Sequence, residues 1–126
     1  HKVLQILVNL VQNALQAMDG GQGVRELTLE IARAEGGRVH VAVADTGCGI
    51  AAADLVRVFH MGFTTREEGN GFGLHSAANA ATEMGGRLWA ESEGTGRGAR
   101  FVLELPARAE SPALASGSSD GGGVTR

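Results

Sequence analysis

Glycine is placed in clusters along this chain, and these clusters constrain its fold more than any other feature of the sequence. The chain holds 20 glycines in 126 residues. Because glycine has no Cβ, each cluster allows the backbone to turn sharply, to hinge, or to approach a ligand closely. The helices and strands must therefore fit between the clusters, which lie at residues 20–23, 36–37, 47–49, 69–73, 85–86, 94–98 and 121–123.

Periodic apolar residues predict the elements between these clusters. Residues 1–18 predict a helix. Its apolar stripe is formed by Leu4, Val8, Val11, Leu15 and Met18. Alternating apolar residues predict a half-buried strand at residues 27–31 and a partner strand at residues 39–43, joined as a hairpin. The further predicted elements are a short helix at residues 51–59, a mobile loop at 60–72, a helix at 73–84, and strands at 87–93 and 99–105.

The composition is that of one globular domain followed by a tail. Hydrophobic residues make up 43% of the chain, enough for a packed core, and a net charge of -3 provides no basic footprint for nucleic acid. No apolar run could span a bilayer, and no signal peptide opens the chain. The single cysteine, Cys48, favours a reducing compartment. We expect a cytoplasmic domain at residues 1–106 without nucleic-acid or membrane contacts, and a disordered tail at residues 107–126.

Asn9 and Asn13 are four residues apart, so they share one face of the first predicted helix. Asparagine has a low helix propensity, and two asparagines in mid-helix need a reason. One reason is a solvated polar face. The other is a site for a metal ion and phosphate, because an amide oxygen is a hard ligand of the kind that Mg²⁺ prefers.

Asp45 ends the second predicted strand and precedes Gly47 and Gly49. A carboxylate at this position can accept a hydrogen bond from an exocyclic amine, and the glycines would allow a flat ring to lie against the backbone. An ordinary Asp-x-Gly turn is the alternative. If the carboxylate is enclosed without a donor of its own, a ligand is favoured, because such burial is costly.

The run from Gly69 through Gly71 to Gly73 leads directly into a predicted helix. The free N–H groups and the dipole at a helix start suit a phosphate group. The run is neither a dinucleotide fingerprint nor a P-loop, because it lacks both a surrounding parallel strand-helix-strand unit and a following Gly-Lys-Ser/Thr.

Taken in order, these motifs resemble the GHKL superfamily, and above all the catalytic ATP-binding (HATPase) domain of bacterial two-component sensor histidine kinases. The matching stretches are QILVNLVQNALQAM, DTGCGI, VFHMGFTT, GNGFGLH and GRGARFVLELP. The resemblance covers residues 1–106. It implies an α+β fold of the Bergerat type, a two-layer α/β sandwich in which helices cover one face of a mixed, largely antiparallel sheet.

The resemblance also implies roles for individual residues toward ATP and Mg²⁺. Asn13 would coordinate the metal, Asn9 would support the metal or the phosphates, and Asp45 would bind the adenine amine. Phe59 and Phe63 would anchor a lid over the nucleotide. The other residues implied to bind the nucleotide are Gln16, Gly47, Gly49, Thr64, Thr65, Gly69, Gly71, Phe72, Gly73 and Leu74.

Several positions depart from the pattern of the family or of its relatives. Related gyrase, mismatch-repair and heat-shock ATPases carry a water-activating glutamate in place of Asn9, so this chain fits transfer better than hydrolysis. Many members have lysine in place of Gln16, where it contacts a phosphate. Arg66, in the predicted lid, is the candidate that would replace this contact and act in catalysis. Many relatives have threonine in place of Ala99, so we expect one contact near the adenine pocket to be missing.

None of the four histidines has the sequence context of a phosphorylated histidine. His1, His40, His60 and His75 are each interpreted as structural or surface residues. The resemblance therefore implies a domain that is incomplete at its N-terminus and that phosphorylates a histidine on the dimerisation domain of the same kinase, which then serves a response regulator. Two alternatives remain: a nucleotide-binding module without catalysis, and an anti-sigma-factor serine kinase of the same fold.

Overall fold

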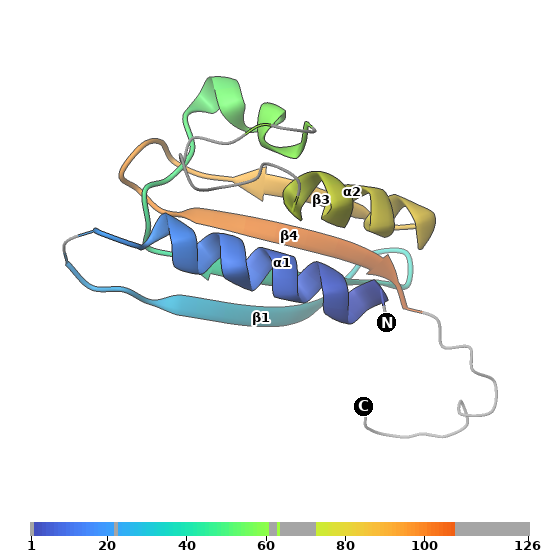
Figure 1. The fold of residues 1–126 in the computed structure, drawn as a ribbon. Coiled ribbons are helices and arrows are strands. Elements are labelled where there is room, and N and C mark those ends of the chain that lie inside the picture. Colours follow the sequence, from blue (N-terminus) through green and yellow to red (C-terminus); the bar gives the residue numbers. More distant parts are fainter. Residues whose placement is uncertain (1, 22, 61–62, 64–72, 108–126) are drawn as a thin grey trace.

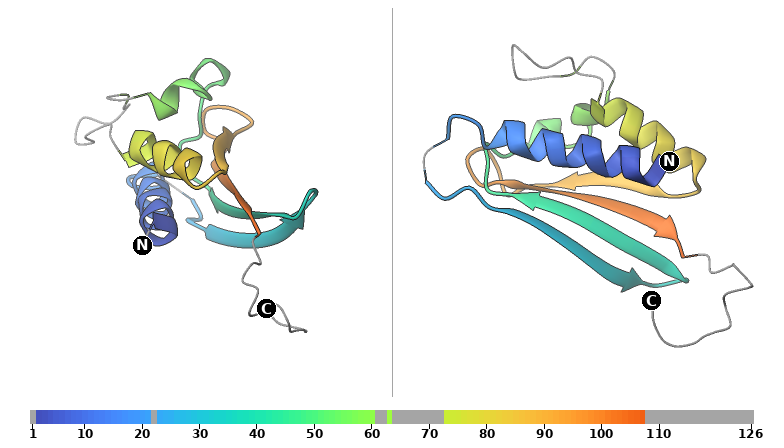
Figure 2. Two further views of the ribbon diagram at one scale, coloured as in Figure 1. Left: turned by 90° about the vertical axis from the view of Figure 1, so that its right-hand side faces the viewer. Right: turned by 60° about the horizontal axis from the view of Figure 1, so that its bottom comes forward.

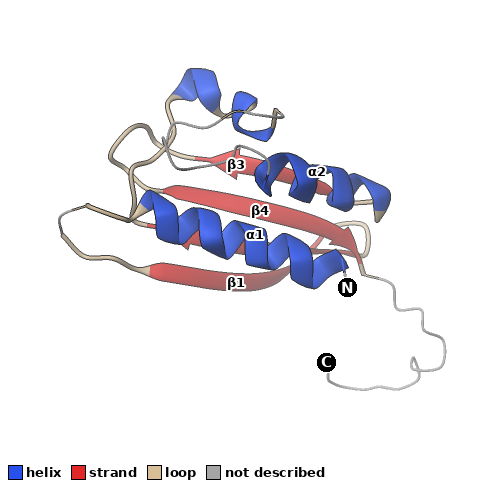
Figure 3. Ribbon diagram, in the orientation of Figure 1, coloured by secondary structure: helices blue, strands red, loops and turns tan. Residues whose placement is uncertain are grey.

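The computed structural model describes residues 2–21, 23–60, 63 and 73–107, which form two layers. Figure 1 shows two helices side by side over one face of a four-stranded sheet, and Figure 3 colours the two layers separately. The predicted α+β sandwich is confirmed. Its elements are α1 (Lys2–Ala17), β1 (Leu27–Ala34), β2 (Arg38–Asp45), the 3-10 turns η1 (Ala52–Asp54) and η2 (Arg57–Phe59), α2 (Gly73–Glu83), β3 (Arg87–Glu91) and β4 (Ala99–Pro106).

The strands are arranged in the order β1-β2-β4-β3, and each pair of neighbours is antiparallel. The sheet was predicted to be mixed and largely antiparallel, whereas every strand pair among the described residues is antiparallel. The reason is that β4 is inserted between β2 and β3. These two strands run in the same direction, but neither is the other's neighbour.

The hairpin of β1 and β2 closes where the sequence predicted a turn. Gly36 and Gly37 have φ angles of 74° and 73°, a region that residues with a Cβ rarely adopt. The register pairs Ala34 with Arg38 across this turn. The two glycines therefore fix where the chain reverses and, with it, the pairing of the two strands.

The buried face of α1 is not the predicted one. Ile6, Leu10 and Ala14 are fully buried, whereas Leu4 and Leu15 of the predicted stripe are 60% and 54% exposed. Because α1 packs against α2 as well as against the sheet, the helix is rotated toward α2. The stripe beside the predicted one then faces the core. It meets buried side chains of the other elements, which include Val43, Ala77, Ala81, Phe101 and Leu103.

The first strand forms as predicted, but it is not half-buried. Leu29 and Ile31 are 57% and 76% exposed. The register places them opposite Val43 and Val41, so they lie on the face of the sheet that carries the helices. Figure 2 shows why they stay exposed: in the described part of the chain, α1 and α2 lie over the other strands and leave the edge of the sheet at β1 uncovered.

No helix within these described residues has the length and apolar character that a bilayer crossing requires.

Candidate functional site

Asp45 is the most unusual polar residue on the helix-covered face of the sheet. The residue is 7% exposed, and its Oδ1 accepts a hydrogen bond of 2.8 Å from the backbone N–H of Gly47. The other oxygen, Oδ2, is buried and has no hydrogen-bond partner among the described residues. Burial raises the pKa of this carboxyl, against the opposing effect of the backbone amides of Gly47 and Ala99. A buried acceptor without a donor is costly unless a ligand supplies the donor.

The turn after Asp45 is held between two other parts of the chain. A Cβ on Gly47 would collide with the carbonyl of Ala17 at the end of α1, and a Cβ on Gly49 would collide with the carbonyl of Gly94. Both glycines are therefore required by the packing of the protein itself. Their predicted contact with a flat ring stays a prediction.

The two asparagines lie on the flank of α1 that faces α2. Asn9 and Asn13 are partly buried, and neither amide is hydrogen-bonded to another described residue. Gly73 begins α2 beside them, since a Cβ on it would lie 3.9 Å from Oδ1 of Asn9. The fold thus brings the asparagine pair next to the helix start that the sequence assigned to phosphate. Gln16, three residues beyond Asn13, is exposed.

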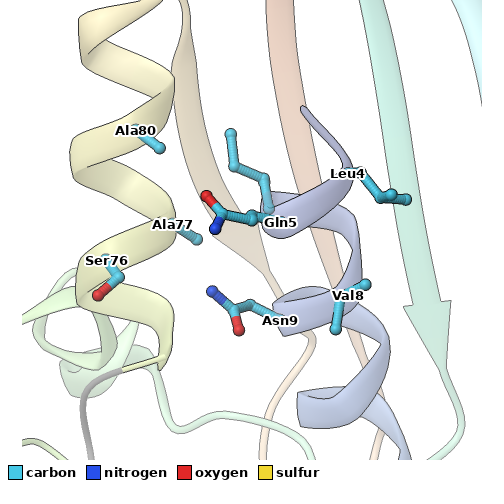
Figure 4. A pocket seen from close by; sticks show the side chains of 8 residues that line it. Leu4, Gln5, Val8, Asn9, Ser76, Ala77 and Ala80 are labelled. Atoms are coloured by element: carbon cyan, nitrogen blue, oxygen red, sulfur yellow. The ribbon is translucent and has the colours of Figure 1, made fainter. Parts of the chain in front are cut away.

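A groove of about 530 Å³ separates the N-terminal half of α1 from α2. Figure 4 shows Gln5 and Asn9 pointing across it from α1 toward α2. The other lining residues are Leu4, Ile6, Val8, Ser76, Ala77 and Ala80. Of the asparagine pair, Asn9 lines this groove.

The residues predicted to anchor the lid pack on the core. The ring of Phe59 contacts that of Phe101 edge to face, with centroids 6.0 Å apart, and Phe63 packs against the same core with Arg57 over its ring. His75, interpreted as structural or surface, lies with Nδ1 3.1 Å from the carbonyl oxygen of Phe59 and ties η2 to α2. Leu74 also packs on the core.

Several predicted residues fall outside the residues that the structure describes, and their roles stay predictions. They are Thr64, Thr65, Arg66, Gly69, Gly71 and Phe72, together with most of the predicted lid at 60–72.

Two further residues lie close to Asp45 or to the turn that follows it. Ala99 was expected to lack a contact near the adenine pocket, and the register places it directly opposite Asp45. Ser92 was not noted at all, and it hydrogen-bonds to Ile50 at the end of the turn that follows Asp45. Its only local signal is its place before the glycine cluster at 94–98.

Known proteins resemble this chain in both sequence and fold. A family model described as histidine kinase-, DNA gyrase B-, and HSP90-like ATPase matches residues 1–109. Sensor protein FixL of Bradyrhizobium diazoefficiens is 40% identical over 109 residues, which are 86% of this chain and 21% of that protein. Sensor histidine kinase ZraS of Escherichia coli O157:H7 is 42% identical over 105 residues, covering 83% and 22%.

A solved structure of full-length ShkA in complex with AMPPNP has the same fold, with a TM-score of 0.73 and 33% identity. The match covers 83% of this chain and 21% of that chain. The chain therefore spans about a fifth of the length of the relatives that it matches.

Proposed function

Because the chain belongs to the family of histidine kinase-, DNA gyrase B- and HSP90-like ATPases, we propose that it binds MgATP and transfers the γ-phosphate to a histidine. The acceptor would lie on the dimerisation domain of the same parent kinase, which then passes the phosphate to a response regulator. The domain would act in the cytoplasm, where ATP is present.

One observation carries this proposal: a buried, unpaired carboxylate oxygen lies at one end of α1, and an asparagine pair lies farther along the same helix. Ala17, at the end of α1, contacts the turn after Asp45, and Asn9 is eight residues earlier. At 1.5 Å per residue this separation is roughly 12 Å. An extended adenosine triphosphate can bridge it, with its amine donating to Asp45 and its phosphates beside Asn9.

The residues at the phosphate end fit Mg²⁺ and phosphate groups. Asn9 and Asn13 offer amide oxygens, and the start of α2 at Gly73 offers backbone N–H groups and the positive end of a dipole. No group of three His, Cys, Asp or Glu residues suited to a metal occurs among the described residues, so amide oxygens are the protein ligands at hand. When bound, Mg²⁺ would neutralise charge on the phosphate oxygens.

Transfer is favoured over hydrolysis because Asn9 cannot act as a general base toward water. The work of the chain would be to hold the triphosphate in line with an incoming imidazole and to stabilise its charge. In the step itself, the bond between the γ-phosphorus and the β–γ bridging oxygen breaks and ADP leaves, while a P–N bond to one imidazole nitrogen forms and the other ring nitrogen releases its proton to water.

Two of the described histidines are poor candidates for the acceptor. Both ring nitrogens of His75 lie within hydrogen-bond distance of neighbours, the carbonyl of Phe59 and the amide of Asn79. His40 lies on the opposite face of the sheet, paired with Glu104. This arrangement supports an acceptor outside the domain.

The proposal is tested with γ-labelled ATP and Mg²⁺. The chain alone should bind the nucleotide in titration calorimetry and remain unlabelled. Adding the dimerisation domain of the parent kinase should produce acid-labile label on that domain. Acid-labile label on the histidines of this chain contradicts the proposal. Nucleotide binding without transfer favours a non-catalytic module, and acid-stable label on a serine of a partner favours a serine kinase.

A further inference from the structure

We infer that Ser92 is a positioning residue for the adenine end of the site, because its hydroxyl joins the turn after Asp45 to the turn between β3 and β4. The inference rests on the proposed function, since it concerns how Asp45 is presented to the base. The hydrogen bonds of Ser92 do not reach Asp45, and Ser92 does not line the groove, so any effect that it has on a nucleotide must pass through the backbone.

The hydroxyl of Ser92 is saturated with backbone partners. It accepts hydrogen bonds from the N–H groups of Ile50, at 3.0 Å, and Gly94, at 3.2 Å. It donates to the carbonyl of Gly98 at 2.6 Å, and the carbonyl of Gly94, at 3.3 Å, is the longer alternative. One donor and two acceptor sites are all that a hydroxyl offers. The side chain is partly buried, so these bonds exchange with water only when the turns separate.

The turn that Ser92 closes, at residues 92–98, packs against the backbone of Asp45 and of the turn that follows it. The N–H of Gly98 donates to the carbonyl of Gly47 at 3.2 Å, and the N–H of Gly96 donates to the carbonyl of Cys48 at 2.7 Å. A Cβ on Gly98 would collide with the carbonyl of Asp45 itself. These bonds form a seam between the turn at residues 46–50 and the turn at residues 92–98. Ser92 bonds to both sides of this seam, at the N–H of Ile50 and at the carbonyl of Gly98.

Loss of the hydroxyl would leave the N–H of Ile50 and the carbonyl of Gly98 without their partner. The two turns would then be held together by the backbone bonds of Gly96 and Gly98, without the link from Ile50 through Ser92 to Gly98, and the free oxygen of Asp45 would be held less firmly relative to the base. Contacts at Asn9, Asn13 and Gly73 lie on α1 and α2 and do not involve this seam. The inference thus predicts a loss of base recognition with phosphate recognition intact.

The test compares nucleotides that differ only at the base. Inosine diphosphate has a carbonyl where adenosine diphosphate has the exocyclic amine, so it lacks the 6-amino donor that we assign to Asp45. Wild-type chain should bind ADP more tightly than IDP in the presence of Mg²⁺. Ser92→Ala should weaken ADP about ten-fold, the loss of one buried hydrogen bond, and leave IDP and inorganic tripolyphosphate unchanged. Ser92→Thr, which keeps the hydroxyl, should restore the preference for ADP.

Thr95→Ala is the matched control, because Thr95 is exposed in the same turn and makes no hydrogen bond to the described residues. Ser92→Cys serves if Ser92→Ala does not fold, with a smaller loss that is still confined to ADP. An unchanged preference for ADP in Ser92→Ala overturns the inference, and so does an equal loss for all three ligands, which would make Ser92 merely structural. If wild-type chain binds neither ADP nor IDP, the proposed function fails first; if it binds both equally, the role of Asp45 toward the amine fails, and the inference fails with it.

Discussion

Asp45 and Glu104 lie on opposite faces of the same sheet and are buried to nearly the same degree, yet they differ in the partners of their carboxylate oxygens. Asp45 is 7% exposed and Glu104 is 8% exposed. Oδ2 of Asp45 has no partner among the described residues. Both oxygens of Glu104 are paired: Arg38 lies 2.8 Å from Oε2, and Nε2 of His40 lies 2.8 Å from Oε1. Burial alone therefore does not distinguish a binding residue from a structural one.

The pKa values of the two carboxyls move in opposite directions. Hydrogen bonds from His40 and Arg38 lower the pKa of Glu104 to about 2, with Arg87 adding to the effect. Desolvation raises the pKa of Asp45 above its usual value. The fold thus stabilises the charge of Glu104 and penalises the charge of Asp45. A carboxylate that the fold leaves unsatisfied is the one available to a ligand.

The largest expected effect is on Asp45. Asp45→Asn replaces an acceptor by a group that also presents donors, and a buried hydrogen bond to a charged group is worth about 1.5–3 kcal/mol. We expect affinity for ADP and Mg²⁺ to fall by about ten-fold or more in titration calorimetry. Because the folded-state pKa of Asp45 is raised, its ionised form costs stability at pH 7. The free energy of unfolding of the variant should therefore be equal to or higher than that of the wild type.

Asp54→Asn is the matched control, since it removes the same charge from an exposed pair with Arg57. It should leave the affinity for ADP unchanged. If Asp45→Asn binds ADP as the wild type does, Asp45 is not part of the adenine site. If the variant unfolds at much lower urea concentration, Asp45 is structural and resembles Glu104.

The sequence predicted Asp45, Asn9 and Asn13 as site residues because their signals are local. A strand that ends in Asp-x-Gly and a helix with two asparagines four apart can be recognised without knowledge of the fold. The network of Glu104 could not be predicted, because its partners Arg38 and Arg87 come from strands that are paired only by the register. Ser92 escaped for the same reason, since its contact at Ile50 is 42 residues away in sequence.

The fold class and most elements could also be predicted, whereas the orientation of two elements could not. Alternation and glycine turns are local patterns, and they predicted the hairpin of β1 and β2. In α1, two neighbouring stripes are both apolar, so the pattern cannot tell which one faces the sheet. The exposure of Ile31 depends on whether a helix lies over β1, and no periodicity within β1 contains that information.

The second-largest effect is expected at Glu104, on the face of the sheet opposite Asp45, and it concerns the free energy of unfolding. Glu104→Gln should lower the free energy of unfolding at pH 7, because Arg38, His40 and Arg87 lose their charged partner. The sign follows from a folded-state pKa of about 2, below the usual value of 4.5. Such a group stabilises the fold above pH 4.5, and this contribution is lost as the pH falls through 4.5 toward 2.

Urea unfolding of the wild type and of Glu104→Gln at several pH values checks this prediction. The difference between them should be largest near pH 7 and should shrink steadily between about pH 5 and pH 2. Glu93→Gln, at a side chain that is 83% exposed, is the control and should show no such trend. A difference independent of pH would mean that Glu104 stabilises the fold by its shape rather than by its charge. Affinity for ADP should be unaffected in either variant.

The smallest effect is expected at Glu91, an exposed carboxylate on the same face of the sheet as Glu104. The hydrogen bond from the indole of Trp89, at 2.9 Å, lowers its pKa, and Arg100 contributes in the same direction. Its side chain is nevertheless 49% exposed, so water screens these partners. Glu91→Gln should lower the free energy of unfolding by less than about 1 kcal/mol, the usual range of an exposed ion pair. A loss at Glu91 as large as that at Glu104, measured in the same urea titrations at pH 7, would show that the number of partners rather than burial decides the stabilisation on this face. A small loss at Glu91 beside a large one at Glu104 would show that partners stabilise the fold chiefly where water is excluded. Oδ2 of Asp45 is buried in the same way but has no such partner among the described residues.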